Sequence, residues 1–164
     1  DLADLLRDLP ENVNQQVLRS MDSQDRERLN AVLGFEEDTA GGIMTSDFIA
    51  LKTYYTVDQT IAVLRQEARE AENIYYLYVL DDFGHLVGVV TLRSLIVASP
   101  ERRLAELMST RVISVTTGED KGAAAELFAK YRFRALPVVD EDGVMKGIIT
   151  IDDVLEDVAP ELNR

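Results

Sequence analysis

The stretch LYVLDDFGHLVGVVTLRSL, residues 77–95, returns without a gap as LPVVDEDGVMKGIITIDDV, residues 136–154. Each copy has two apolar runs joined by a short turn that contains glycine, which predicts a β-hairpin followed by the start of a helix. An internal repeat of this kind predicts that one small structural unit occurs twice. The coinciding positions are Leu77/Leu136, Val79/Val138, Asp81/Asp140, Gly84/Gly143, Gly88/Gly147 and Thr91/Thr150.

A second pair of similar segments precedes the hairpins. IMTSDFIAL, residues 43–51, corresponds to LMSTRVISV, residues 107–115, and an amphipathic helix pattern follows each of them. Each copy is therefore predicted as strand, helix, strand, strand, helix. Because about 55–60 residues are few for a stable core, the two copies are expected to pack through their sheets. The second helix pattern carries an apolar stripe that is expected to lie in the core: Ala124, Leu127, Phe128 and Tyr131.

Residues 1–37 are predicted to form short helices. One apolar face precedes Pro10, and a second helix pattern, DSQDRERLNAVLGF, has Asp22 or Ser23 as its N-cap and Gly34 just beyond its end. Since the pattern is already helical at the first residue, we expect the chain to be a fragment of a longer protein. The leucines of the first face must pack on something else: Leu2, Leu5, Leu6 and Leu9.

Composition narrows the function classes. Hydrophobic residues make up 46% of the 164 positions, which is typical of a folded globular protein. The 30 acidic residues against 17 basic ones give a formal net charge of −13, which disfavours nucleic acid and anionic membranes as partners and favours cations. The chain has no Cys and only one His, His85, so disulfides and an ordinary zinc site are not expected. No apolar run approaches the roughly 20 residues of a membrane-spanning helix.

An acidic segment, TIDDVLEDVAPEL, closes the second copy at residues 150–162. In a helix these acids would form like-charge pairs four residues apart, each costing a few tenths of a kcal/mol. One interpretation is helix capping by Asp152 or Asp153, because carboxylates accept bonds from the free N–H groups of a first turn. Capping leaves the later acids unexplained, so the alternative interpretation is cation binding. The later acids are Glu156, Asp157 and Glu161.

Two motifs resemble a known family. GIITIDD, residues 147–153, resembles the end of a CBS domain, and two copies in tandem resemble a Bateman module. EEDTAGGIMT, residues 36–45, is more specific, and together with the two hairpin stretches it resembles the cytosolic part of the MgtE family of magnesium channels. The resemblance implies an α+β fold in which a tandem CBS-domain pair follows a small all-α helical segment. Gly41 and Gly42 are expected to allow a tight joint between the two.

The resemblance also implies domain boundaries and a function. The implied function is a homodimeric Mg²⁺ sensor on the cytoplasmic side of the cell membrane that regulates a transmembrane pore domain of the same chain. The implied domains are the end of a helical N domain (1–37), CBS domain 1 (40–101), CBS domain 2 (102–160) and the start of a helix leading to the membrane part (161–164).

Mg²⁺ prefers oxygen ligands and is usually held by one or two carboxylates. Arg132 and Gly122 stand where the family pattern leads us to expect acids, so at least one family site is expected to be lost or rebuilt. The ligand candidates carried over from the resemblance are Asp1, Asp4, Asp120, Asp152, Asp153, Glu156, Asp157 and Glu161.

Bateman modules often bind adenosine nucleotides such as ATP, so a nucleotide is the second expected ligand. Tyr76 and Phe133 are candidates for contacting the base, Arg93 for the phosphates and Asp153 for the ribose. In the first copy Ser94 stands at the position of Asp153, so that pocket would lack its acid. Ordinary core packing is the alternative interpretation of the two aromatic residues.

No catalytic constellation is visible in the sequence. It contains no Ser/His/Asp or Cys/His set, P-loop or glycine-rich nucleotide fingerprint, so we predict that the chain is not an enzyme. The rival hypothesis is a nucleotide-sensing Bateman module that regulates another transporter or an enzyme. A homodimer is expected because the helix after each hairpin carries apolar residues suited to a two-fold interface: Leu95, Ile96, Val97, Val154, Leu155 and Val158.

Overall fold

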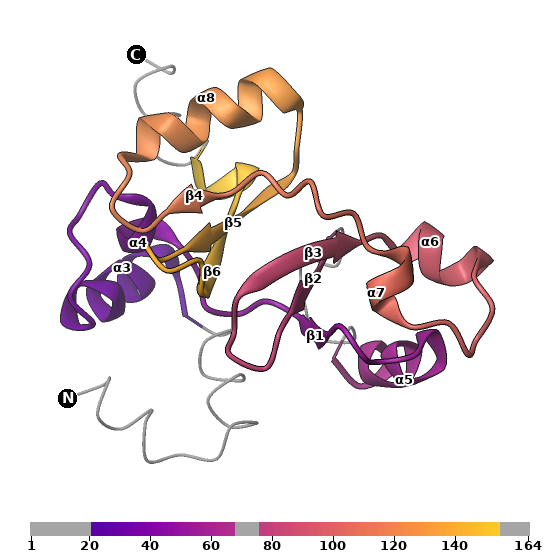
Figure 1. Cartoon of the computed structure of the whole chain (residues 1–164). Helices are drawn as coiled ribbons and strands as arrows, with labels where there is room; N and C mark the ends of the chain where they lie inside the picture. Colours follow the sequence, from indigo (N-terminus) through magenta and orange to yellow (C-terminus); the bar gives the residue numbers. More distant parts are fainter. Residues whose placement is uncertain (1–20, 68–75, 155–164) are drawn as a thin grey trace. The chain divides into compact units, whose positions relative to one another are not determined.

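The computed structural model describes residues 21–67 and 76–154 (Figure 1). The predictions made for Leu2, Leu5, Leu6, Leu9, Leu155 and Val158 lie outside these residues. The chain divides into two compact units. Unit 1 comprises Asp1–Asp47, Ser114–Glu141 and Lys146–Arg164, and unit 2 comprises Phe48–Ile113 and Asp142–Met145.

Unit 2 holds the first copy of the repeat, in the predicted element order. A three-stranded sheet has the order β1-β2-β3, in which β1 runs parallel to β2 and β2 runs antiparallel to β3. All four residues of β2 are buried, as expected for a central strand. The elements are β1 (Ala50–Lys52), α5 (Val57–Glu67), β2 (Leu77–Leu80), β3 (Leu86–Val90), α6 (Leu92–Val97) and α7 (Leu104–Leu107). The core residues are Ile49, Leu51, Val57, Leu64, Leu77, Val79, Val90, Leu95 and Leu104.

The predicted glycine turn joins β2 to β3. Gly84 has a positive φ of 86°, which L side chains rarely adopt. The Asp81 carboxylate accepts hydrogen bonds from the backbone N–H groups of Phe83 and His85, both at 2.9 Å, and its second oxygen lies 2.9 Å from His85 Nδ1. Desolvation alone would raise the pKa of Asp81, but the bonds from His85 and Phe83 outweigh it and lower the pKa.

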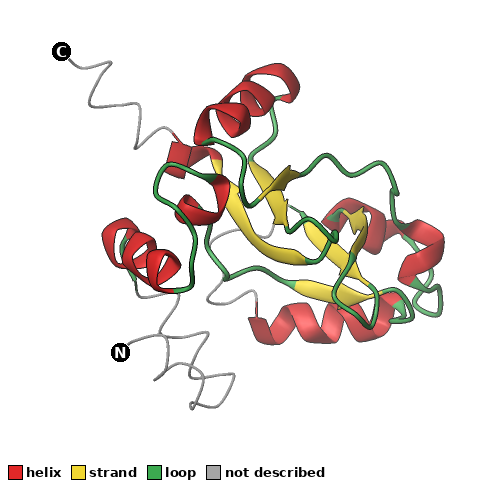
Figure 2. Cartoon of the chain, turned by 60° about the vertical axis from the view of Figure 1, so that its left-hand side comes forward, coloured by secondary structure: helices red, strands yellow, loops and turns green. Residues whose placement is uncertain are grey.

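Unit 1 holds the second copy together with the helices that precede the first. Its sheet has the order β4-β5-β6, with β4 parallel to β5, and α8 contacts β5 (Figures 1 and 2). Residues 151–154 continue from β6 as a helix. The elements are α3 (Ser23–Val32), α4 (Ala40–Ile43), β4 (Val115–Thr116), α8 (Lys121–Tyr131), β5 (Ala135–Val139) and β6 (Met145–Thr150). The predicted α+β class and tandem repeat are thus confirmed.

The apolar stripe of α8 is only partly a core feature. Ala124 and Phe128 are buried as predicted, with 0% and 5% exposure. Tyr131 is 41% exposed and stacks on Phe133, with ring centroids 5.4 Å apart, so its assignment to the core was wrong. Tyr131 is the last residue of α8, where the chain turns into the left-handed conformation at Arg132.

The segments that lead into the two copies pack in a matched way. Thr45 pairs with Ile148 of β6 in unit 1, and Ser109 pairs with Val89 of β3 in unit 2. Each segment places a methionine over a glycine: Met44 lies against Gly147, and Met108 lies against Gly88. The leading segment of the first copy therefore completes the unit that contains the second hairpin.

Gly147→Ala is expected to lower the free energy of unfolding by about 2 kcal/mol, the usual range for overpacking a core. A Cβ at this position would lie 2.6 Å from the Thr45 carbonyl oxygen and 2.8 Å from Met44 Sδ, and the backbone carbonyl cannot swing aside. Denaturant titration measures the change. Gly118→Ala is the matched control, because a Cβ added there would meet nothing within 4 Å and the loss should be small. Equal losses in both variants would contradict the prediction.

Candidate metal and nucleotide site

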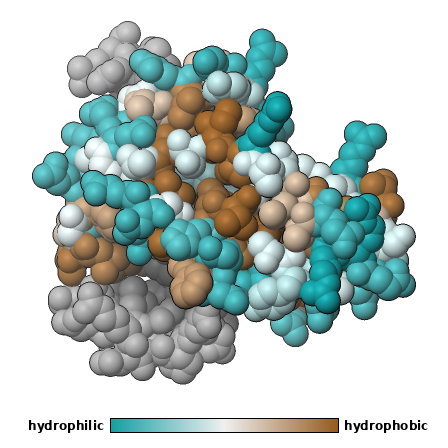
Figure 3. Space-filling view, viewed as in Figure 1, coloured by the Kyte–Doolittle hydropathy of each residue, from teal (hydrophilic) through white to brown (hydrophobic). Residues whose placement is uncertain are grey.

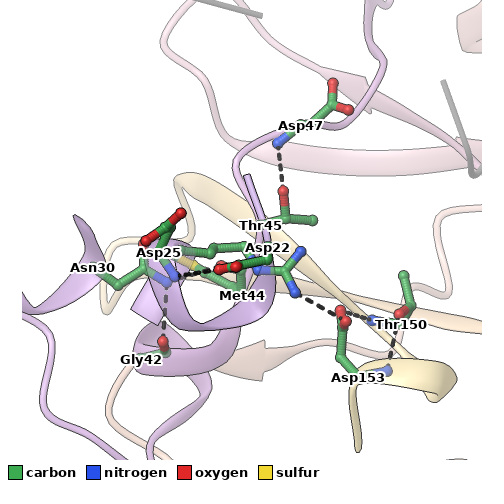
Figure 4. Close-up of polar contacts among 10 residues, drawn as sticks. Asp22, Asp25, Asn30, Gly42, Met44, Thr45, Asp47, Thr150 and Asp153 are labelled. Atoms are coloured by element: carbon green, nitrogen blue, oxygen red, sulfur yellow. Dashed lines mark hydrogen bonds and ion pairs between the residues drawn. The ribbon is translucent and has the colours of Figure 1, made fainter. Parts of the chain in front are cut away.

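The acidic segment begins with a capping box. Asp153 N donates to Thr150 Oγ1 at 3.2 Å, and Thr150 N donates more weakly to Asp153 Oδ2 at 3.4 Å (Figure 4). The side chain of Asp153 therefore closes the box from the third position of the helix, and Thr150 takes the role of N-cap that the sequence suggested for Asp152 or Asp153. Asp152 is exposed.

The first copy has the same box with a shorter residue. Thr91 Oγ1 accepts from Ser94 N, and Ser94 Oγ accepts from Thr91 N, both at 3.2 Å. Because Ser94 corresponds to Asp153 in the repeat, a hydroxyl is sufficient for this cap. The negative charge at Asp153 has another partner.

That partner is Arg26 of α3. Arg26 Nη2 donates to Asp153 Oδ1 at 3.0 Å, and the two side chains are only 19% and 16% exposed. Within the described residues, Arg26 Nε is buried without a hydrogen-bond partner. Sequence reasoning missed Arg26, since the two arginines among the acids of DSQDRERLN look like part of a solvated helix face.

A second link ties α3 to the joint between the helical segment and the first repeat. Asn30, which is 1% exposed, donates through Nδ2 to the carbonyl oxygens of Gly42 and Met44 at 3.0 and 2.8 Å (Figure 4). A Cβ at Gly41 would lie 2.6 Å from Phe35 Cδ1, so the joint is as tight as the two glycines led us to expect. Helix α3 is thus attached both to α4 and to the start of the acidic segment.

The ends of α3 follow the sequence signals. Asp22 is the N-cap, and its carboxylate accepts from Asp25 N at 2.8 Å. At the other end Gly34 has a positive φ of 98°, and the N–H groups of Gly34 and Phe35 donate to the carbonyls of Ala31 and Asn30. This is the Schellman pattern that stops a helix. The predicted caps are confirmed.

Asp120 also has a structural role. It is the N-cap of α8, and its Oδ1 accepts from Gly122 N at 2.7 Å. Next to it, Lys121 forms an ion pair of 2.9 Å with Asp38. Gly122, which stands where the family pattern has an acid, supplies the capped N–H group.

The described residues contain no group of three or more acidic or His side chains that could hold a metal ion. Asp120, Asp152 and Asp153 all belong to unit 1. The other predicted ligands lie outside the described residues, so the composition of the metal site stays a prediction. These residues are Asp1, Asp4, Glu156, Asp157 and Glu161.

The residues proposed to contact a nucleotide belong to two different units. Tyr76 precedes β2, and Arg93 lies exposed on α6, both in unit 2. Phe133 and Asp153 belong to unit 1, where Phe133 stacks on Tyr131 and Asp153 is paired with Arg26. The nucleotide hypothesis therefore also stays a prediction.

One buried polar group was not anticipated. Tyr78 of β2 is 3% exposed, its ring packs edge-on against Phe48, and its hydroxyl has no hydrogen-bond partner among the described residues. Burial raises the pKa of Tyr78 well above its ordinary value. A tyrosine in an apolar strand gives no sequence signal that separates it from ordinary core aromatics.

The surface residues proposed for a dimer are partly as expected. Ile96 and Val97 on α6 are 79% and 78% exposed, whereas Leu95 is 1% exposed and Val154 is 7% exposed. The assignment of Leu95 and Val154 to an outer apolar face was wrong, because both side chains are buried and Leu95 is part of the core of unit 2.

Hydrophilic residues cover much of the face seen in Figure 3. None of the described helices is long and apolar enough to cross a membrane.

Comparison with known families assigns nearly the whole sequence. The profile of the CBS domain matches residues 40–101 and 104–160, and that of the MgtE intracellular N domain matches residues 1–38. CBS domains of this type are regulatory and non-enzymatic, so the prediction that the chain is not an enzyme is confirmed.

Individual relatives agree with these matches. The magnesium transporter MgtE of Thermus thermophilus is 43% identical over 159 residues, which cover 95% of this chain and 35% of the relative. MgtE of Bacillus subtilis is 38% identical over 164 residues, covering 100% of this chain and 36% of the relative. This chain therefore spans about a third of the length of these proteins.

A solved structure gives the same result. The cytosolic domain of the Mg²⁺ channel MgtE in complex with ATP superposes with a TM-score of 0.75 at 43% identity. The superposition covers 95% of this chain and 64% of that one.

Proposed function

The chain belongs to the CBS domain family, as a tandem pair behind part of an MgtE intracellular N domain, and from that premise we propose that it is the Mg²⁺-sensing regulatory region of a magnesium transporter. The observation that carries this proposal is the contact of α3, from the end of the N-domain segment, with the start of the acidic segment through Arg26 and Asp153. A cation bound at the acidic segment would change the strength of its contact with the N-domain segment.

The charge of the protein supports a cation as the controlling ligand. With a formal net charge of −13 per chain, the acidic side chains repel one another. Divalent ions bound between facing carboxylates would relieve that repulsion. A site made from one or two carboxylates is weak, which suits an ion present at roughly millimolar concentration, where binding is worth about 4 kcal/mol. Several such sites acting together would make the conformation of the region respond to a change in Mg²⁺ concentration. Asp152 and Asp120, both exposed, are the proposed ligands in unit 1 besides Asp153.

We place the region on the cytoplasmic side of the membrane, joined to a pore domain in the same chain, and acting as a homodimer. Ile96 and Val97 support the dimer, because two large apolar side chains at the end of one helix are nearly fully exposed. A second copy of the chain would cover them across a two-fold axis. In this proposal, Mg²⁺ closes the assembly and the closed assembly shuts the pore.

Small-angle scattering and limited proteolysis over a Mg²⁺ series test the proposal. The wild-type protein is expected to compact between chelator and about 10 mM Mg²⁺, which is well above a millimolar dissociation constant. Asp153→Asn with Glu156→Gln should require clearly more Mg²⁺, because a tenfold loss at each site corresponds to about 1.4 kcal/mol. A wild-type particle whose radius and cleavage pattern do not respond to Mg²⁺ would refute sensing.

A matched control separates ligand loss from general charge loss. Asp58→Asn with Glu101→Gln removes the same two charges from exposed positions of unit 2 that are not predicted ligands. This variant should compact at the wild-type Mg²⁺ concentration. An equal shift in both double variants would mean that net charge alone sets the response.

The second candidate function is sensing of an adenosine nucleotide. It is favoured by the ATP complex of the similar cytosolic domain and by the exposed Arg93. Ser94 in place of an acid speaks against a ribose contact in the first copy. Calorimetric titration with ATP, with and without Mg²⁺, distinguishes a nucleotide sensor from a sensor of the ion alone.

A further inference from the structure

The carboxylate of Asp153 already has donors on both oxygens. Oδ1 accepts from the Arg26 guanidinium at 3.0 Å, and Oδ2 accepts from Thr150 N at 3.4 Å. The first is a charge-assisted bond in a site where the side chains are mostly shielded from water, so it is the stronger of the two. A cation that binds Asp153 therefore meets a carboxylate whose charge is already offset by the Arg26 guanidinium.

Comparison of the two repeats indicates which interaction requires the negative charge of Asp153. Ser94 closes the capping box of the first copy with a neutral hydroxyl. Asp153 closes the matching box with a carboxylate and in addition holds Arg26. Since a hydroxyl is sufficient for the cap, the extra negative charge in the second copy is explained by the ion pair with Arg26.

Arg26 in turn depends on Asp153. Its side chain is 19% exposed, whereas that of Arg28, on the same helix, is 78% exposed and lies 3.7 Å from Asp25. In the described residues Arg26 Nε has no partner, so Asp153 is the carboxylate that offsets the burial of this guanidinium. Removing either partner leaves an uncompensated charge in a partly buried site.

We propose that Arg26 is an internal competitor of Mg²⁺: it occupies Asp153 when the ion is absent, and its displacement sets the Mg²⁺ concentration at which the region responds. This inference rests on the proposed sensing function. A guanidinium and a divalent ion at one carboxylate repel each other, so each weakens the binding of the other. The ion pair also holds α3 against the acidic segment in the ion-free protein.

The test compares three variants of the chain in the same Mg²⁺ series. Arg26→Gln is expected to lower the midpoint Mg²⁺ concentration roughly tenfold, equivalent to about 1.4 kcal/mol. Arg26→Lys keeps the competing charge and should shift the midpoint much less. Arg28→Gln is the matched control, since it removes one positive charge from the same helix at an exposed position and should leave the midpoint unchanged.

A second measurement keeps the inference testable if Arg26→Gln does not fold. In ¹⁵N-labelled wild-type protein, the Arg26 Nε–H signal, assigned with Arg26→Lys, should move with Mg²⁺ at the same midpoint as compaction. An Arg26 signal that stays constant while the particle compacts would overturn the competition.

The outcomes separate this inference from the proposed function. If the wild type responds to Mg²⁺ and Arg26→Gln has the same midpoint, competition is wrong and sensing stands. If neither protein responds, both are wrong. In an Asp153→Asn background, Arg26→Gln should no longer lower the midpoint, and a persisting shift would show that Arg26 acts through another group.

Discussion

Asn30→Leu is expected to lower the free energy of unfolding by about 3 kcal/mol, because two buried carbonyl groups each lose their partner at a cost of about 1–3 kcal/mol. Leucine has a similar volume, so the change removes the donor without opening a large cavity. The affected carbonyls are those of Gly42 and Met44, in the joint that leads into the first repeat. Denaturant titration gives the loss, and limited proteolysis between residues 35 and 45 should become faster.

Gln24→Leu on the same helix is the control for this variant. Gln24 is exposed, and changes at such positions usually stay within about 0.5 kcal/mol. If Asn30→Leu behaved like Gln24→Leu, the two hydrogen bonds would not be what fixes α3 to the joint. Resistance of the joint to protease in Asn30→Leu would lead to the same conclusion.

Leu77→Ala and Leu136→Ala are each expected to lower the free energy of unfolding by about 3 kcal/mol. Both leucines are 0% exposed and occupy the same position of the repeat, on β2 and β5 respectively. Truncation leaves a cavity that the neighbouring strands can only partly fill. Chemical denaturation of the two single variants measures the loss in each unit.

Ile96→Ala serves as the comparison. Ile96 is 79% exposed, so the same kind of truncation should cost little in a monomer. Under conditions where the proposed dimer forms, Ile96→Ala should instead shift the monomer–dimer balance, which sedimentation measures. A loss for Leu136→Ala much smaller than that for Leu77→Ala would mean that the second core is the more adaptable of the two.

The order of elements was predictable because it depends on local periodicity. Apolar runs of four or five residues, a glycine with positive φ in each turn, and helical spacing of apolar residues are all properties of neighbouring positions. The partner of a leading segment is not such a property. Nothing in residues 43–45 indicates that Thr45 pairs with Ile148, since that choice is made by packing after the chain has folded back.

The candidate site shows the same limit. Asp153 could be selected from the resemblance to a family, but Arg26 could not, because the two residues are 127 positions apart and their contact leaves no periodic trace. The cap at Asp22 was predicted, since a cap and its helix are adjacent in sequence, whereas Asp120 was expected only as a metal ligand and the structure shows it as the N-cap of α8. An ion pair between two residues far apart in the sequence could not be predicted from the sequence.

Neither repeat can be inherited alone with its packing intact. A gene fragment that starts after Thr45 would encode the second hairpin without the Met44 side chain that covers Gly147. A fragment that ends before Leu107 would encode the first hairpin with Gly88 uncovered, because Met108 would be missing. Since each copy covers a glycine of the other's hairpin with a methionine of its own leading segment, deletion of either copy would damage the packing of the other.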